Sequence, residues 1–248
     1  MYTCGYWKDA SNLEQAQVQK LDLVCRKLGL KKGQHILDIG CGWGSFAKYA
    51  AEKYGVSVTG ITVSKEQVEF GRKLCAGLQV TFELKDYHDI EGEFDHIVSL
   101  GMFEHVGYKN HRAFMQIAQA HLKDGGLFLL HTIGGRFSKH IGEPWITKYI
   151  FPNGLIPSVA QIGTAIENIF IMEDWHNFGA DYDKTLMSWF RNFDTNWPKL
   201  KFAYNDRFYR MWKYYLLACA GAFRARELQL WQLVLSKRGV EGGYNTIR

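Results

Sequence analysis

The sequence of 248 residues contains little cysteine and proline, and it has no long apolar run. The cysteines are odd in number and none belongs to a C-x-x-C pair, so neither a disulfide framework nor a structural zinc site is indicated. The five are Cys4, Cys25, Cys41, Cys75 and Cys219. No run approaches the roughly 20 apolar residues that cross a bilayer, and we expect no signal peptide. This pattern is typical of a reducing compartment, so we expect a cytoplasmic protein without a metal site.

The charge balance is only mildly basic. Thirty Lys and Arg stand against 25 Asp and Glu, which gives a formal net charge of +5. Such a surplus suits an anionic partner such as a phospholipid surface or RNA, but it more often reflects an ordinary solvated face. The hydrophobic content of 47% is enough to fill the core of one large α/β domain.

A glycine-rich stretch, HILDIGCGWG at residues 35–44, organises the rest of the chain. Its first half is a short apolar run with β-branched residues, as expected of a strand buried on both faces. Gly40, Gly42 and Gly44 then allow a sharp turn close to a bound molecule, and a helix is expected to begin at Ser45. With Asp38 at the end of the strand, the stretch predicts a ligand-binding corner.

Strands and helices alternate along the first half of the chain. We expect strands at residues 36–39, 56–61, 80–84, 94–100 and 127–131, with one helix after the first strand and another over 64–75 after the second. This alternation indicates a doubly wound, mostly parallel α/β sheet with right-handed crossovers. The strands would then deliver their carboxyl ends to one edge, where open α/β sheets bind ligands.

The alternation stops at Gly134. Residues 135–157 hold three of the four prolines and several aromatics, which predicts an inserted lid over a substrate cleft. We expect a helix over 158–168, a sixth strand over 169–175 and an aromatic-rich helical region over 182–223. A final hydrophobic strand at 227–235 is predicted to pair with the sixth.

The polar and aromatic residues at the ends of the strands indicate which kind of cofactor binds. A nicotinamide-binding fold usually places an acid about 20 residues beyond the glycines, but the second strand ends without a carboxylate. Thr62 and Gln67 offer hydrogen bonds to a ribose, and Asp86 with Tyr87 suits an adenine, the first by accepting from its amino group and the second by stacking. These residues favour an S-adenosylmethionine-dependent methyltransferase over a dehydrogenase.

Three further side chains are candidates for chemistry. Glu104 and His131 follow the fourth and fifth expected strands, although a strand-end glutamate often only caps a helix and a lone histidine is often structural. Cys219 lies on an apolar helix face, where a cysteine is usually a small buried hydrophobe. The many aromatics mostly suit core or cleft lining, but they also stabilise cations by about 0.5–2 kcal/mol each.

Seven motifs, in order, closely resemble the cyclopropane-fatty-acyl-phospholipid synthase family. They are YTCGYW at 2–7, LDIGCGWG at 37–44, GMFEHVG at 101–107, LHTIG at 130–134, YIFPNG at 149–154, DWHNFG at 174–179 and ACAGAFR at 218–224. The resemblance implies one catalytic domain over 1–248 with a seven-stranded class I methyltransferase sheet, its last strand antiparallel. It also implies lipid-cleft insertions near 135–165 and 178–223. The family's phospholipid enzymes carry a further segment upstream of the first motif, so the resemblance implies that this chain corresponds to their catalytic domain.

The resemblance also implies a reaction and its residues. S-adenosylmethionine would donate a methylene to the cis double bond of an unsaturated phospholipid acyl chain, through a carbocation that a bound bicarbonate deprotonates. The bicarbonate positions match Cys4, Glu104, His131, Ile133 through its backbone, and Tyr182, while Cys219 matches a suspected catalytic cysteine. The cofactor would contact Tyr2, Thr3, Asp38, Gly40, Cys41, Gly42, Thr62, Gln67, Asp86 and Tyr87.

The implied partner is unsaturated phospholipid, reached by peripheral contact with the inner face of the cytoplasmic membrane. A homodimer is possible on this resemblance, and no nucleic acid is expected. Two alternatives remain open: a mycolic-acid-type lipid modifier, and a non-catalytic lipid- or RNA-binding module that keeps the methyltransferase fold.

Overall fold

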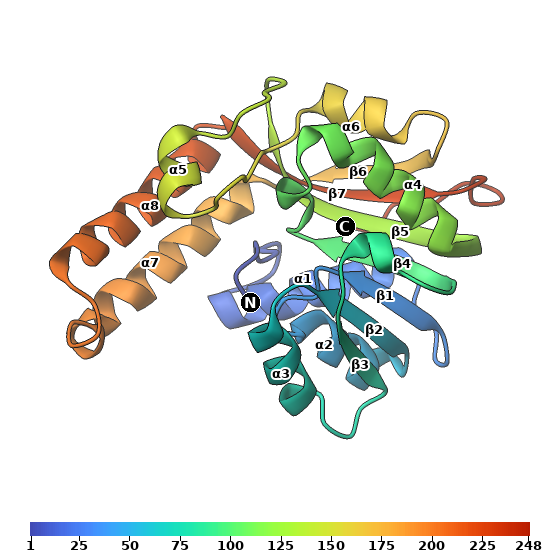
Figure 1. Cartoon of the computed structure of the whole chain (residues 1–248), viewed down its shortest axis with the longest axis horizontal. Helices are drawn as coiled ribbons and strands as arrows, with labels where there is room; N and C mark the ends of the chain where they lie inside the picture. The colour runs from blue at the N-terminus through green and yellow to red at the C-terminus, as the bar shows by residue number, and fades with distance from the viewer.

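A seven-stranded mixed sheet runs through the computed structural model, which describes residues 1–248. The strand order is β3-β2-β1-β4-β5-β7-β6 (Figure 1). The strands are β1 (His35–Ile39), β2 (Ser57–Thr62), β3 (Val80–Leu84), β4 (Phe94–Leu100), β5 (Leu122–Gly135), β6 (Ile171–Asn177) and β7 (Leu228–Ser236). All seven strands predicted from the sequence are present, which confirms the doubly wound α/β fold.

The pairing confirms the predicted direction of the strands. β1, β2, β3, β4 and β5 pair in parallel, whereas β7 lies antiparallel between β5 and β6. The last strand therefore pairs with the sixth, as expected, but it also pairs with the fifth. β5 begins at Leu122, earlier than the expected residue 127, because Leu122 pairs with Phe94 ahead of a register shift.

Helices cover both faces of the sheet. α1 (Leu13–Leu28), α2 (Ser45–Tyr54) and α3 (Lys65–Leu74) enclose one apolar cluster, and α4 (His111–His121) with α6 (Val159–Ile166) encloses another on the opposite face. Three short 3-10 turns, η1 (Tyr87–Asp89), η2 (Phe103–His105) and η3 (Tyr108–Asn110), follow β3 and β4. Since both faces are packed, the carboxyl edge of the strands is where a ligand can approach.

The remaining helices project from this body as an arm (Figure 1). The arm consists of α7 (Ala180–Leu200) and α8 (Asp206–Arg224), which pack along each other, and α5 (Pro144–Tyr149) lies beside it. The sequence predicted one helical region over 182–223, but a turn divides it. Pro198 lies in the last turn of α7, and the Asn205 side chain accepts from Phe208 N–H to cap a new helix.

No helix of the chain combines the length and apolar character needed to cross a membrane. No group of three or more His, Cys, Asp or Glu side chains is arranged to hold a metal ion.

Candidate active site

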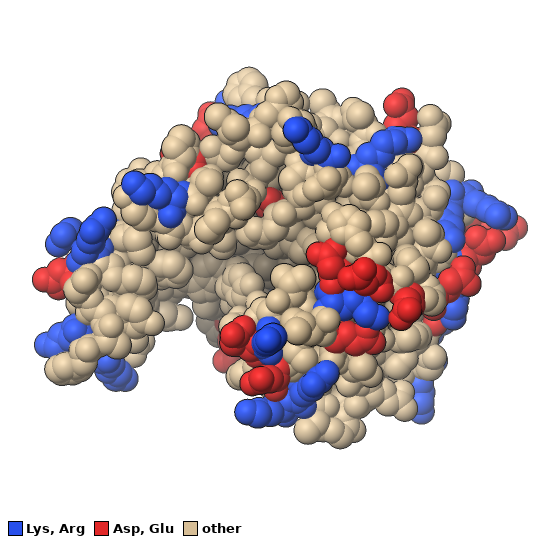
Figure 2. All heavy atoms as spheres, in the orientation of Figure 1, with Lys and Arg blue, Asp and Glu red and all other residues tan.

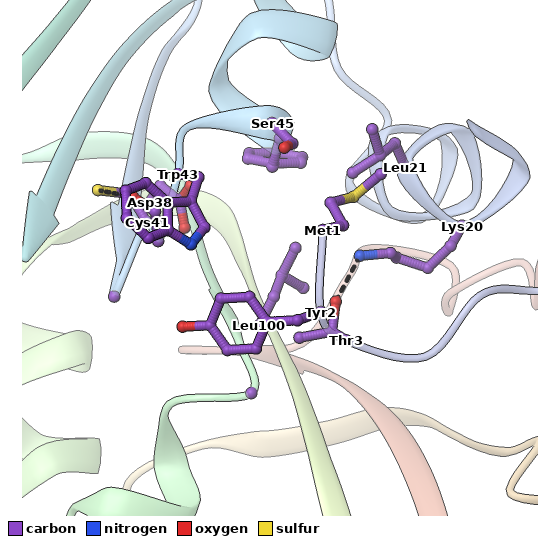
Figure 3. Close-up of a pocket in the computed structure, with 14 residues that line it drawn as sticks. Met1, Tyr2, Thr3, Lys20, Leu21, Asp38, Cys41, Trp43, Ser45 and Leu100 are labelled. Atoms are coloured by element: carbon purple, nitrogen blue, oxygen red, sulfur yellow. Dashed lines mark hydrogen bonds between the residues drawn. The ribbon is translucent and has the colours of Figure 1, made fainter. Parts of the chain in front are cut away.

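The glycine turn after β1 forms the floor of a pocket at the carboxyl edge of the sheet. Gly40 and Gly42 both have positive φ, 77° and 53°, so the backbone doubles back before α2 begins. A Cβ on Gly42 would meet no atom within 4 Å, so this part of the turn is open to an approaching molecule. The pocket is lined by Met1, Tyr2, Thr3, Lys20, Leu21, Asp38, Gly40, Cys41, Gly42, Trp43, Ser45, Phe46, Leu100 and Gly101 (Figure 3).

The N-terminal segment, residues 1–7, lies over this pocket. Lys20 of α1 donates from Nζ to Thr3 Oγ1 at 2.8 Å (Figure 3), and Gln17 donates to the Thr3 carbonyl at 2.9 Å. Thr3 also packs against the end of β4, because a Cβ on Gly101 would lie 2.9 Å from Thr3 Cγ2. The segment therefore brings Tyr2 and Thr3 to the glycine turn, together with Asp38, Gly40, Cys41 and Gly42.

Two buried charges of opposite sign face this pocket. Asp38 and Lys20 are each 1% exposed, and Asp38 Oδ2 has no hydrogen-bond partner in the protein. Burial raises the pKa of Asp38 to about 7 and lowers the pKa of Lys20 to about 8, while each charge partly counters the shift of the other. A zwitterionic ligand would satisfy both groups.

Lys20 is a residue that the sequence analysis did not single out as part of a site. Its position among the apolar residues of α1 that recur at helical spacing is the signal that could have identified it, because a lysine there is buried.

Four predicted cofactor residues lie outside this lining. Thr62 donates to Gln67 Oε1 at 2.7 Å, so these two side chains are held together at the end of β2. Asp86 accepts from His88 N–H at 3.0 Å and remains half exposed, whereas the Tyr87 ring packs in the core against Phe114. Their contact with a cofactor stays a prediction.

Glu104 and His131 form a second group beside the first. Glu104 Oε1 accepts from Ile133 N–H at 2.7 Å, which connects the turn after β4 to β5. Gln232 of β7 lies with its amide nitrogen 3.3 Å from His131 Nδ1. Glu104 Oε2 and His131 Nε2 are both buried without a hydrogen-bond partner in the protein. Gln232 was not predicted from the sequence, since only the pairing of β7 with β5 brings it to His131.

Cys4, Ile133, Tyr182 and Cys219 belong to one apolar cluster between the N-terminal segment, β7 and the arm. The His131 ring approaches this cluster at Phe178, with ring centroids 6.0 Å apart, and Glu104 reaches it through Ile133. The structure thus brings the six predicted catalytic residues into one neighbourhood.

Burial determines the protonation state of the titratable side chains in this cluster. It raises the pKa of the Cys4 thiol and of the Tyr182 phenol well above their usual values, and it raises the pKa of Cys219 to about 11. Both thiols are therefore protonated at neutral pH and neither is set up as a thiolate nucleophile.

The two remaining groups differ from these. Burial lowers the pKa of His131 well below its usual value, which leaves a neutral imidazole, and burial raises the pKa of Glu104 to about 6, opposed by its bond from Ile133 N–H. The unpartnered Nε2 and Oε2 atoms, with hydroxyl and thiol groups nearby, could hydrogen-bond a small polar ligand.

The strand order, the glycine turn with its strand-end acid and the helical layers define the class of S-adenosylmethionine-dependent methyltransferases. A solved structure of mycolic acid cyclopropane synthase CmaA1, in complex with SAH and CTAB, superposes with a TM-score of 0.89 at 33% identity, covering 96% of this chain and 90% of that one.

Within this class, the chain belongs to the mycolic acid cyclopropane synthetase family, whose model matches residues 1–233. It is 56% identical over 247 residues to the cyclopropane-fatty-acyl-phospholipid synthase of Escherichia coli K12, covering 100% of this chain and 64% of that protein. Cyclopropane mycolic acid synthase 1 of Mycobacterium tuberculosis is 33% identical, covering 95% of this chain and 89% of that protein. The chain thus spans slightly less than two thirds of the E. coli relative.

Proposed function

We propose that the chain transfers a methylene group from S-adenosylmethionine to the cis double bond of an unsaturated phospholipid acyl chain. The observation that carries this proposal is the 56% identity to the E. coli phospholipid enzyme, which extends over the whole of this chain. The same alignment favours a phospholipid over a mycolic acid as the acceptor, because identity to the mycolic acid enzyme is only 33%.

The chemistry moves one carbon and releases one proton. The methyl carbon leaves the sulfonium and bonds to one alkene carbon, which leaves the positive charge on the other. Loss of a proton from the added methyl then closes the three-membered ring, giving a cyclopropane and S-adenosylhomocysteine. Aromatic faces would stabilise such a cation, and Tyr182 with Phe223 and Trp189 forms a cluster of rings beside the predicted catalytic residues.

The pocket residues fit the amino acid part of the methyl donor. Asp38 would hold its ammonium group, and Lys20 with Thr3 would hold its carboxylate. Asp38 Oδ2 has no protein partner, and the two buried side chains carry opposite charges. Thr62, Gln67, Asp86 and Tyr87 remain the expected partners of the ribose and adenine.

The second group of residues fits a bicarbonate ion, which would supply the base for the final proton. We expect Glu104, His131, the Ile133 backbone, Cys4 and Tyr182 to hold it. The unpartnered atoms Glu104 Oε2 and His131 Nε2 support this assignment. In this arrangement Glu104 and His131 position the base and set its charge, and Cys219 contributes to the apolar wall.

The acyl chain would enter from a membrane that the protein contacts peripherally, at the inner face of the cytoplasmic membrane. The chain has no helix suited to crossing a bilayer, so contact at the surface is the mode that we propose. A homodimer is proposed only on the family resemblance.

The proposal predicts a product of defined mass. Incubation with S-adenosylmethionine and vesicles of an unsaturated phospholipid should add 14 mass units to an acyl chain, because a CH2 group is gained. Product mass spectrometry after transesterification measures this directly. A methyl addition without ring closure would also add 14 units but would leave an alkene, so proton NMR of the upfield ring protons completes the test. Folded chain that binds S-adenosylmethionine but converts neither phospholipid nor mycolic acceptors would contradict an enzymatic role.

The same assay tests the assignment of Glu104. Glu104→Gln keeps the oxygen that accepts from Ile133 N–H but removes the charge beside the base. We expect product formation to fall by roughly a hundredfold or more, while the affinity for S-adenosylmethionine, measured by calorimetry, changes less than threefold. An equal loss of turnover and cofactor affinity would show that Glu104 acts in the cofactor pocket instead.

A further inference from the structure

The end of the arm, where α7 and α8 are joined, exposes both apolar and basic side chains. We call residues 199–210 the arm tip. Phe202 is 88% exposed and Tyr204 is 46% exposed, the former being the most exposed large hydrophobic side chain of the chain. Four basic residues, Lys199, Lys201, Arg207 and Arg210, stand in this stretch against one acid, Asp206.

The charge is concentrated where the arm ends. Figure 2 shows Lys and Arg side chains around the projecting end of the arm with few acidic neighbours, and a hollow between the arm and the body. The Lys201 ammonium lies 5.6 Å from the centre of the Phe202 ring, so cation and aromatic ring are presented together. A surface hollow lined by Tyr149, Ala203, Tyr204, Asn205, Arg207, Phe208 and Met211 adjoins them.

An aromatic track connects the arm tip to the candidate active site. Tyr204 stacks on Phe208 at 4.4 Å between ring centroids, Phe208 on Trp212 at 5.8 Å, and Trp212 contacts Tyr215 at 5.2 Å. The track continues from Tyr215 to Phe151 at 6.0 Å and from Phe151 to His105 at 5.7 Å. Trp212 and Tyr215 of the track also pack against the apolar cluster that contains Cys4 and Tyr182, so the track reaches the predicted catalytic residues.

We propose that the arm tip is the surface by which the chain docks on a bilayer that contains anionic phospholipid. Exposed aromatic rings favour the interface between headgroups and acyl chains, and the basic side chains around them pair with anionic headgroups. The aromatic track then gives an acyl chain an apolar path toward the site; this step rests on the proposed function.

RNA would also attract the basic side chains, but it explains the other features less well. Nucleic-acid surfaces use basic residues spread over an extended face, whereas these four lie within residues 199–210, at one end of the arm. A solvent-exposed phenylalanine at the very end of the arm has a clear partner in the apolar layer of a membrane. The bilayer is therefore the occupant that we assign.

Flotation of the chain with lipid vesicles tests this proposal without any turnover. Vesicles of phosphatidylcholine alone and of phosphatidylcholine with phosphatidylglycerol are compared, with no S-adenosylmethionine present. We expect binding to the anionic vesicles that weakens as NaCl rises. The double variant Lys199→Gln, Lys201→Gln should bind about tenfold to thirtyfold more weakly, since each surface charge contributes about fivefold. The variant Phe202→Ser, Tyr204→Ser should bind more weakly at every salt concentration.

The matched control is Lys31→Gln, Lys32→Gln, which removes the same charge from the exposed loop before β1. It should bind vesicles within twofold of the unaltered chain. Hydrogen exchange should slow at residues 199–210 when vesicles are added. Equal losses in control and arm-tip variants, unchanged binding in the arm-tip variants, or tighter binding to a single-stranded RNA that vesicles do not displace would each overturn the proposal.

A separate assay distinguishes this proposal from the proposed function. Turnover is measured with phospholipid dispersed in detergent, where docking on a bilayer is not needed. Loss of the cyclopropane product there with intact vesicle binding would leave docking in place and contradict the enzymatic role. If the arm-tip variants still form product and also bind vesicles normally, the docking proposal is contradicted and the proposed function is not.

Discussion

At the scale of single residues, the cofactor pocket is defined by charges that the fold does not satisfy internally. Asp38 ends a strand buried on both faces, and Lys20 crosses from α1 to Thr3. Burying an ionised carboxyl group with one free oxygen costs free energy, so the folded chain retains this arrangement at the expense of stability. Unfavourable burial of this kind is common where a ligand later supplies the missing partner.

Asp38 should make the stability of the folded chain depend on pH. Because the pKa of Asp38 rises from its ordinary value of 3.8 to about 7 on folding, the folded chain holds a proton that the unfolded chain releases. Stability due to this group is therefore full below about pH 4 and is lost as pH rises toward 7. Asp38→Asn removes that loss, so its stability gain over the unaltered chain should grow from near zero at pH 4 to about 2–4 kcal/mol at pH 7. Urea unfolding at several pH values measures the difference.

The control for this prediction is Asp89→Asn, which changes an exposed acid. Its unfolding free energy should follow that of the unaltered chain within about 0.5 kcal/mol at every pH. Asp38→Asn should at the same time weaken S-adenosylmethionine binding. A variant that is destabilised at pH 8 would show that Asp38 is ionised and satisfied in the fold.

At the scale of elements, the sequence was most informative where periodicity and turns agree. The parallel strands, the glycine turn and the helix starting at Ser45 were predicted from local patterns alone. α4 was not predicted, although Phe114, Met115 and Ala118 have helical spacing and are all buried. The division of the arm into two helices was also missed, because a proline near a helix end and one capping asparagine are weak signals within a long aromatic stretch.

The site was predicted less completely than the fold, for a physical reason. Positions at strand ends, and then the family motifs, indicated Glu104 and His131, but Gln232 and Thr185 act only through contacts between distant parts of the chain. Gln232 lies 101 residues from His131, and Thr185 lies 180 residues from Gly5. No local spacing rule relates such pairs, since they meet only after β7 and α7 have packed.

Thr185 of α7 anchors the N-terminal segment. Its hydroxyl accepts from Gly5 N–H at 3.1 Å and from Trp7 Nε1–H at 2.9 Å, and it donates to the Asp181 carbonyl at 3.0 Å. Cys4 Sγ lies 3.8 Å from the same oxygen. One side chain therefore couples the arm to the segment that covers the cofactor pocket.

Thr185→Val should release that segment while preserving side-chain volume. Two N–H donors lose their acceptor, so we expect the free energy of unfolding to fall by about 2 kcal/mol. Hydrogen exchange should accelerate over residues 2–7, and affinity for S-adenosylmethionine should fall because Tyr2 and Thr3 are no longer held. Thr185→Ser keeps the hydroxyl and should retain most of the affinity. If both variants behave alike, packing rather than hydrogen bonding holds the segment.

At the scale of the whole molecule, a charged cluster joins the last residues of the chain to α1 and β6. Arg248 donates to both carboxylate oxygens of Asp174, at 2.6 and 2.7 Å, and Lys27 Nζ lies 3.4 Å from the same carboxylate. Tyr244 donates to the Lys27 carbonyl at 2.9 Å. The edge strand β6 is thereby fixed to α1.

Arg248→Ala should weaken the attachment of β6 to α1 without affecting catalysis. Asp174 would keep only Lys27, and we expect unfolding free energy at pH 7 to fall by about 1–3 kcal/mol, a value tempered by the partial exposure of Arg248. Burial alone would raise the pKa of Asp174, but the Arg248 hydrogen bonds and the Lys27 charge outweigh it and lower that pKa below 3.8. The effect is therefore present above pH 4 and disappears as the carboxylate protonates at lower pH.

Arg238→Ala, which removes an exposed pair with Asp124, should change stability by less than 0.5 kcal/mol in the same urea titrations. Equal effects of the two variants would mean that the cluster does not hold β6 in place.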